Sequence, residues 1–482
     1  MIMDDDHVPS LLEAAAQLAD CRVTATTLTQ RCLDRIERYD GALHSFVAVA
    51  AERALEAAGK ADRELCEGRY RGLLHGIPYA VKDVYETAGL PTTGGSRAFL
   101  QNRPEQNATC VERLDAAGAV LLGKLATHEL TYGGVDIALP WHPARNPWDY
   151  DRDPGGSSSG AGVAIAAGFC LAALGTDTGG SIRLPAALCG IVGLKPTYGH
   201  VSRRGVMPNS FTLDHCGPMT WTVGDCAAVL GIIAGHDRDD PGSSTAPVPD
   251  FSQSLGRDIR GVRVGVAAHF WEHDLPADQI VCDAMAAALD KLRELGAVLG
   301  RAELRPLAEY AIPKVTIQLP EIFSHYGDGA RHRPELFGPK FRTRIASGDK
   351  VNAVDYVRAQ RARLELTRHM HEVISSFDVL VTSGPYPARL LADVAAEQQR
   401  NKLEITVPFS MTGFPAISIG IGFTANGLPL SMQIVGRPFD EPTVLRVADA
   451  YEHATPWRSR RPPLRELPSK KGSILNHARS SC

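Results

Sequence analysis

Two short runs rich in glycine and serine contain the residues best suited to chemistry. The first, GGSSSG at residues 155–160, places Ser158 at the centre of a G-x-S-x-G pattern. Such a pattern can form a nucleophile elbow when a hydrophobic strand runs straight into the turn, but here the preceding residues are DYDRDP. A loop that caps a helix starting near Ala161 is therefore favoured over an elbow. A phosphate-binding loop is a third interpretation, although no Gly-Lys-Ser/Thr sequence follows.

The second run, GTDTGGSIR at residues 175–183, follows an apolar segment and places two glycines before Ser181. Adjacent glycines allow several backbone N–H groups to converge on one point, which is what the stabilisation of a developing oxyanion requires. The alternative is a tight turn before a helix at residues 184–188. Taken alone, the run is compatible with either structure.

A single lysine, Lys82, closes the apolar run GIPYAVK at residues 76–82, which predicts a strand. On its own it is best explained as a surface side chain or as an ion-pair partner of Asp83. A serine nucleophile needs a base, however, and neither glycine-rich run contains a histidine. A neutral lysine can act as that base, and burial lowers the lysine pKa towards that state. Asp83 should not oppose the shift, because successive strand side chains point to opposite faces.

Three segments together resemble the amidase signature family: GIPYAVKD, PGGSSSG and GTDTGGSIRLPAALCGIVGLKPT. The resemblance implies amide hydrolysis by a Ser-Ser-Lys triad, with Lys82 as base, Ser157 as bridging hydroxyl and Ser181 as nucleophile. It also implies a cis peptide bond between Gly156 and Ser157. The backbone N–H groups that match the family's oxyanion hole are those of Thr178, Gly179, Gly180 and Ser181.

The resemblance further implies cleavage of the C–N bond of a carboxylic amide to an acid and an amine, through an acyl-enzyme on Ser181. Small amides, aryl amides and carbamates are the candidate substrates. Thr131, Tyr132 and Gly133, within the similar segment KLATHELTYGG, are expected to contact the substrate. Neither a metal nor an organic cofactor is expected, and the only expected partners are the amide and water.

Two other functions stay open. The A subunits of glutamyl-tRNA amidotransferase share this core and the segment PTYGxVSRxG, so the chain could be a glutaminase subunit that feeds ammonia to a partner. Those subunits usually carry a tyrosine-rich stretch before the helix predicted at residues 354–374, where this chain reads GDKVNAVDYVRAQ. This difference favours a stand-alone amidase. A non-catalytic glycine-rich binding module is the alternative from another class, but it leaves the joint spacing of Lys82, Ser157 and Ser181 as a coincidence.

The composition excludes several classes of partner. The 482 residues carry 51 basic and 55 acidic side chains, a net charge of −4, which argues against nucleic acid as the main partner. The first ten residues, MIMDDDHVPS, do not resemble a signal peptide. The longest apolar stretch, residues 161–174, is shorter than the ~20 residues of a membrane helix. The ten cysteines include no CxxC pair, which argues against a zinc site. The protein is expected to be a cytoplasmic monomer or homodimer.

Hydrophobic periodicity predicts an α/β fold. Helices are expected over most of residues 11–62 and at 108–117, 225–234, 280–295, 354–374 and 442–453, with strands at 76–82, 119–123, 262–267, 379–382, 416–423 and 428–435. This alternation, together with the resemblance, predicts an α/β/α sandwich with a large mixed central sheet covered by helices. We expect a single domain over residues 1–463, with an insertion near the substrate at about 306–349, and a flexible tail over residues 464–482.

Overall fold

The computed structural model describes residues 8–397 and 403–465. In this part of the chain, eleven strands form one sheet in the order β1-β3-β2-β4-β6-β5-β10-β11-β9-β7-β8. Strand β2 is parallel to β3 and β4, and β7 is parallel to β8 and β9, whereas the remaining neighbours are antiparallel. The predicted mixed sheet is therefore confirmed. The strands are β1 Phe46–Val49, β2 Pro78–Lys82, β3 Val120–Leu125, β4 Ala172–Asp177, β5 Val192–Lys195, β6 His215–Thr220, β7 Arg263–Val266, β8 Val298–Arg301, β9 Val379–Ser383, β10 Ala416–Phe423 and β11 Pro429–Gly436.

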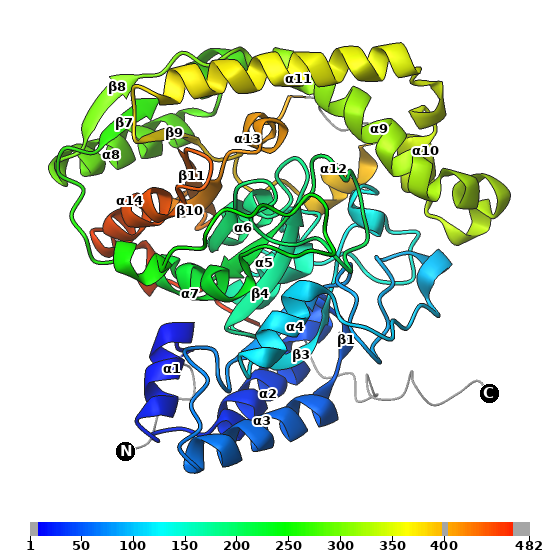
Figure 1. Ribbon diagram of the computed structural model, residues 1–482, viewed down its shortest axis with the longest axis vertical. Helices are drawn as coiled ribbons and strands as arrows, with labels where there is room; N and C mark the ends of the chain where they lie inside the picture. Colours follow the sequence, from blue (N-terminus) through cyan, green and yellow to red (C-terminus); the bar gives the residue numbers. More distant parts are fainter. Residues whose placement is uncertain (1–7, 398–402, 466–482) are drawn as a thin grey trace.

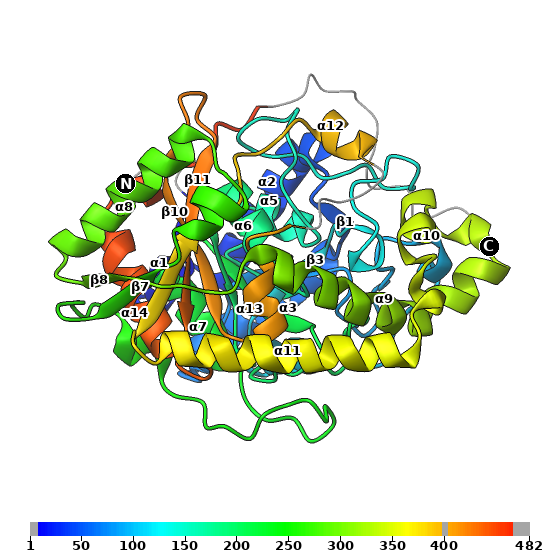
Figure 2. The same cartoon turned by 90° about the horizontal axis from the view of Figure 1, so that it is seen from above.

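Helices pack around this sheet, as Figures 1 and 2 show. Helices α1, α2 and α3 gather at one end of the molecule, and α9, α10 and α11 lie at the other end. The helices are α1 Leu11–Ala19, α2 Ala25–Leu43, α3 Ala51–Cys66, α4 Thr109–Ala116, α5 Ser159–Ala166, α6 Arg183–Cys189, α7 Val223–Ile233, α8 Gln279–Glu294, α9 Leu307–His332, α10 Pro339–Ile345, α11 Ala353–Ile374, α12 Leu391–Ala396, α13 Val407–Thr412 and α14 Glu441–His453.

The structure differs from the sequence-based elements mainly at short strands. Strand β1 lies within the stretch that was expected to be helical, and β5, β6 and β8 were not expected. Strand β6, HCGPMT, contains glycine and proline, and β5, VGLK, ends on a lysine, yet both are fully buried. Such segments lack the apolar alternation that predicts a strand, and only pairing with neighbours in the sheet makes them strands.

The stretch expected to be an insertion, residues 306–349, consists largely of two helices. It contains the 26-residue α9, with Pro313 and Pro320 inside the helix, and α10. These helices contribute to a second hydrophobic cluster, separate from the main core, formed by Leu130, Ile322, Tyr326, Phe337, Phe341 and Ile345. This end of the molecule therefore packs on its own small core beside the loop that contains Leu130.

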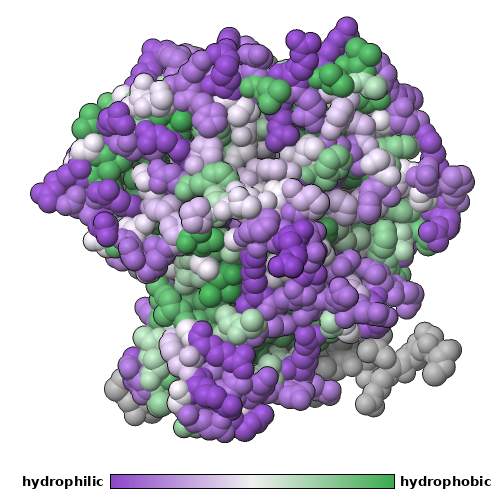
Figure 3. Space-filling model, in the orientation of Figure 1, coloured by the Kyte–Doolittle hydropathy of each residue, from purple (hydrophilic) through white to green (hydrophobic). Residues whose placement is uncertain are grey.

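The surface is mostly hydrophilic on the face drawn in Figure 3. No helix of the described residues is long and apolar enough to cross a membrane. The predicted tail falls almost entirely outside the described residues, which end at residue 465.

Candidate active site

Lys82 is the last residue of β2, and its side chain is completely buried. Its Nζ donates hydrogen bonds to Ser157 Oγ at 2.7 Å and to Thr176 Oγ1 at 2.8 Å. Burial lowers the pKa of Lys82 to about 7, although the carboxylates of Asp177 and Asp214 oppose the shift. The amine is therefore largely neutral slightly above neutral pH, and its free electron pair can then accept a proton.

Asp83 is engaged elsewhere, as the alternation of strand side chains predicted. Its carboxylate accepts hydrogen bonds from the Thr93 N–H at 3.1 Å and from the Thr93 hydroxyl, and it lies 3.4 Å from Lys124 Nζ. Lys124 is itself completely buried. The negative charge of Asp83 is thus matched by a different lysine, so Lys82 has no direct carboxylate partner among the described residues.

Ser157 lies in the loop before α5, and the Gly156–Ser157 peptide bond is cis, as the family resemblance implies. The Ser157 carbonyl accepts a hydrogen bond from the His128 N–H at 3.2 Å. A Cβ atom at position 156 would lie 2.1 Å from the His128 ring. A side chain at position 156 would therefore require the His128 ring to move.

Ser158, the centre of the G-x-S-x-G pattern, is fully buried and belongs to the scaffold. Its Oγ donates to the Thr176 carbonyl and accepts from the Thr176 N–H, both at 3.3 Å. It precedes α5, but its side chain makes no capping hydrogen bond. The hydroxyl therefore ties the loop to the end of β4, and no strand runs into the turn as an elbow requires.

Ser181 ends the glycine-rich loop between β4 and α6. No hydrogen bond within the described part of the chain engages the backbone N–H groups of Thr178, Gly179 and Ser181. The Gly180 N–H instead donates to Asp177 Oδ1 at 2.7 Å. The carboxylate at the end of β4 thus turns back into the loop and engages one of the four N–H groups expected in the oxyanion hole.

A buried ion pair that sequence reasoning missed holds this loop. The Arg183 guanidinium donates to both oxygens of Asp177 at 3.0 Å, and also to Ser410 and Gln433. Both charged side chains are completely buried. Burial alone would raise the pKa of Asp177, but Arg183 outweighs it and keeps that pKa below its usual range. The only sequence signal was the pairing of an aspartate and an arginine within GTDTGGSIR.

A second carboxylate, that of Asp214, is also bonded to the loop. It accepts hydrogen bonds from the Thr178 hydroxyl at 2.6 Å and from the N–H groups of Asn209 and Ser210 at 2.8 and 2.9 Å. Burial raises the pKa of Asp214 to about 6. The loop is thus bonded to two carboxylates, and both of them act to raise the pKa of Lys82.

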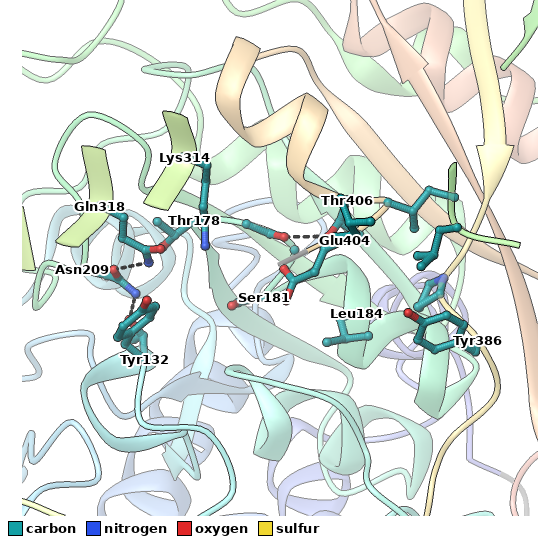
Figure 4. Close-up of a pocket in the computed structure, with 17 residues that line it drawn as sticks. Tyr132, Thr178, Ser181, Leu184, Asn209, Lys314, Gln318, Tyr386, Glu404 and Thr406 are labelled. Atoms are coloured by element: carbon teal, nitrogen blue, oxygen red, sulfur yellow. Dashed lines mark hydrogen bonds between the residues drawn. The ribbon is translucent and has the colours of Figure 1, made fainter. Parts of the chain in front are cut away.

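A small cavity of about 80 Å³ opens in front of Ser181. Figure 4 shows Lys314 and Gln318 reaching into it from α9, with Glu404 and Thr406 on another side. Thr131 and Tyr132 line this cavity together with the whole stretch from Thr178 to Ser181, as expected of substrate contacts, but Gly133 is not among the lining residues. Lys82 and Ser157 are not among the residues that line the cavity. The residues added by the structure are Leu184, Asn209, Leu275, Lys314, Gln318, Pro385, Tyr386, Leu403, Glu404, Ile405 and Thr406.

The described residues contain no group of three or more histidine, cysteine, aspartate or glutamate side chains that could hold a metal ion. The groups that could act on a substrate are therefore the amine of Lys82, the hydroxyls of Ser157 and Ser181, and the amides of the loop. Together they offer a base, a hydroxyl in contact with it, a second hydroxyl at the cavity and N–H donors beside that hydroxyl. This set of groups is suited to acyl transfer.

The sequence profile of the Amidase family matches residues 27–445. The chain belongs to the amidase family. It is accordingly an enzyme that hydrolyses amides. It is 41% identical over 489 residues to one of the A subunits of glutamyl-tRNA(Gln) amidotransferase, that of Chloroflexus aurantiacus, in an alignment that covers 96% of this chain and 100% of that protein.

Solved structures of amidases have the same architecture. The peptide amidase of Stenotrophomonas maltophilia superimposes with a TM-score of 0.83 at 30% identity, over 94% of this chain and 98% of that one. A bacterial aryl acylamidase of the amidase signature family superimposes with a TM-score of 0.86 at 26% identity, over 95% of this chain and 98% of that one. The expected family and fold class are therefore both confirmed.

Proposed function

We propose that this amidase acts alone and hydrolyses a small or aryl carboxylic amide through an acyl-enzyme on Ser181. The observation that carries the proposal is the 2.7 Å contact between the buried Lys82 amine and Ser157 Oγ, together with the position of Ser181 in the wall of the cavity. A lysine with a pKa of about 7 can exchange a proton at neutral pH, as a general base must.

The proposed acylation moves protons through both serines. Lys82 takes the proton of Ser157 while Ser157 takes that of Ser181, and the Ser181 oxygen attacks the carbonyl carbon. The oxyanion accepts hydrogen bonds from the free N–H groups of the loop. When the C–N bond breaks, Ser157 returns a proton to the leaving amine and recovers one from Lys82.

Deacylation reverses the relay. Water replaces the amine and gives a proton to Ser157 as its oxygen attacks the ester carbon, and the ester bond to Ser181 then breaks. Ser181 regains its proton and the free acid leaves. Every proton in the cycle is carried by the substrate, by water or by a side chain of this chain.

The second candidate function is that of a glutaminase subunit, because of the identity to a tRNA-dependent amidotransferase. Against it stands the segment GDKVNAVDYVRAQ, which leads into α11 in place of the tyrosine-rich stretch usual in those subunits. A non-catalytic binding module would have no use for a buried amine that contacts a serine hydroxyl.

A cytoplasmic location also belongs to this proposal. Each of the nine cysteines in the described ranges is a free thiol, and six of them are buried. Reduced thiols are typical of proteins that work in a reducing compartment. A monomer or a homodimer is the expected form.

The deciding experiment is hydrolysis of a substrate panel by the purified single chain. The panel contains aliphatic amides, aryl amides, carbamates and glutamine, and the matched control is Ser181→Ala. Turnover of at least one amide that Ser181→Ala lacks supports the proposal. Turnover of glutamine alone, and only with an added partner, supports the second candidate.

A further inference from the structure

One residue that lines the cavity has a buried acceptor atom without a partner among the described residues. Gln318 is only 2% exposed, and its Nε2 donates to Asn209 Oδ1 at 2.6 Å. Its Oε1 makes no hydrogen bond within the described residues. Among the buried side-chain polar atoms of those residues that lack a partner, it alone belongs to a residue that lines the cavity. A buried acceptor is normally satisfied, so a donor on the ligand is expected at this point.

A chain of hydrogen bonds fixes the orientation of that acceptor. Asn209 Nδ2 donates to Thr131 Oγ1 at 2.7 Å, which leaves Asn209 Oδ1 facing Gln318. Because Asn209 Oδ1 can only accept, Gln318 must present its NH₂ group to it. The Gln318 carbonyl oxygen is therefore the atom left for a ligand, and Thr131 is the last member of the chain of hydrogen bonds that sets its orientation.

A donor lies one helical turn away. Lys314 is on α9 four residues before Gln318, so both side chains lie on the same face of the helix. Figure 4 shows the Lys314 amine reaching into the cavity, and a Cβ atom at Gly179 would lie 3.3 Å from Lys314 Nζ. This wall therefore presents a donor and an acceptor side by side, close to the glycine-rich loop.

The charges around the cavity favour a neutral ligand group. Among the described lining residues only Lys314 and Glu404 are charged, one positive and one negative. A carboxylate added to these two described side chains would make the sum of the three charges negative. A carboxamide carries an N–H donor and a C=O acceptor on neighbouring atoms and no charge, so it complements both atoms of this wall.

The ligand part held here is the acyl part. Lys82 and Ser157, which return the proton to the leaving amine in the proposed function, do not line the cavity. We propose that the substrate carries a second carboxamide on its acyl chain, whose N–H donates to Gln318 Oε1 and whose carbonyl accepts from Lys314 Nζ. This inference rests on the proposed hydrolysis at Ser181, and Gln318 and Lys314 are its specificity residues.

The test compares matched substrates. The diamides of malonic, succinic and glutaric acid first establish the preferred chain length by kcat/KM. At that length, the diamide is compared with the amide whose second carboxamide is replaced by a methyl ketone, which keeps the acceptor and loses the donor. The diamide should be preferred roughly 5- to 150-fold, because the ketone leaves the buried oxygen of Gln318 unpaired.

Substitutions of Gln318 and Lys314 then test whether these residues cause the preference for the diamide. In Gln318→Met the ratio of kcat/KM for the diamide to kcat/KM for the keto-amide, the methyl-ketone analogue, should fall to near one. This ratio does not depend on the fraction of folded enzyme. Lys314→Met should lower kcat/KM for both substrates and leave their ratio in place. Ile312→Ala changes an exposed position of the same helix and should keep the wild-type ratio.

Several results would overturn the inference. One is a wild-type ratio of kcat/KM for diamide over keto-amide near one, and another is an unchanged ratio in Gln318→Met. A third is a higher kcat/KM for the half-acid, in which a carboxylate replaces the second carboxamide, than for the diamide. Failure of the proposed function looks different, because then no amide in either panel is hydrolysed by the single chain. Hydrolysis of simple amides without discrimination refutes only the role of Gln318 and Lys314.

Discussion

Two opposing influences set the charge of Lys82. Removal of the amine from water favours its neutral form, whereas the nearby carboxylates of Asp177 and Asp214 favour the ammonium. The result is a pKa of about 7, far below the usual value near 10.5. The amine is thus protonated below neutral pH and free to accept a proton above it.

We therefore predict that kcat/KM rises with pH through about 7 and reaches a plateau above it. Lys82→Ala should lower acylation by roughly 10²- to 10⁴-fold, the usual contribution of a general base. Lys82→Arg should fail as well, because a guanidinium stays charged. The measurement is kcat/KM against pH for the three proteins on one amide. Near-normal rates in Lys82→Arg would mean that Lys82 has only a structural role.

The two candidate nucleophiles make opposite predictions. Ser181 lines the cavity, whereas Ser158 is bonded on both sides to the backbone of Thr176. Ser181→Ala should lower kcat by roughly 10⁴-fold or more. Ser158→Ala should keep substantial activity and lose about 1–3 kcal/mol of stability, because it leaves polar groups of Thr176 unpaired. Peptide mapping after fluorophosphonate labelling checks the assignment, and an adduct on Ser158 would refute it.

At the scale of elements, the site depends on the link between β4 and α6. Asp177 ends β4 and Arg183 begins α6, so their ion pair closes the loop that carries Ser181. Ser410 on α13 accepts a hydrogen bond from Arg183 and donates one to Asp177. Gln433 on β11 accepts a hydrogen bond from Arg183. Two further elements therefore hold the loop in place.

We predict that Arg183→Met destabilises the fold by about 3–5 kcal/mol, because it leaves the buried Asp177 carboxylate without its counter-charge. Asp177→Leu combined with Arg183→Met should cost less than the sum of the single changes. Urea unfolding of the four proteins measures these free energies. Costs that simply add would show that the two side chains are energetically independent.

At the scale of the whole molecule, the cavity lies where distant parts of the chain meet. Its walls come from the loop after β3, the loop between β4 and α6, helix α9 and the segment before α13. Helix α9 belongs to the end of the molecule opposite α1, α2 and α3 (Figure 1). The described residues supply all of these walls from one chain.

The chain should therefore be active without a second polypeptide. We expect the purified protein to hydrolyse its amide at a rate per chain that does not depend on protein concentration, in contrast to a subunit that needs a partner. Size-exclusion chromatography with an activity assay across the peak measures this. Activity that first appears when another protein is added would favour the amidotransferase function.

The family, the mixed α/β fold and the order of Lys82, Ser157 and Ser181 could all be predicted from the sequence. These features are readable because they are local: apolar runs predict strands, and each glycine-serine run is continuous along the chain. The strand ending in Lys82 and the helix at α11 were predicted close to their observed bounds.

Which polar groups are buried together became evident only from the tertiary structure. Arg183 and Gln433 are 250 residues apart in the sequence, and Asn209 and Gln318 are 109 apart. No periodicity signals such pairs, and the strength of each depends on how much water the surrounding chain excludes. The same exclusion lowers the pKa of Lys82. Its chemistry therefore depends on the folded environment, although its position was evident from the sequence.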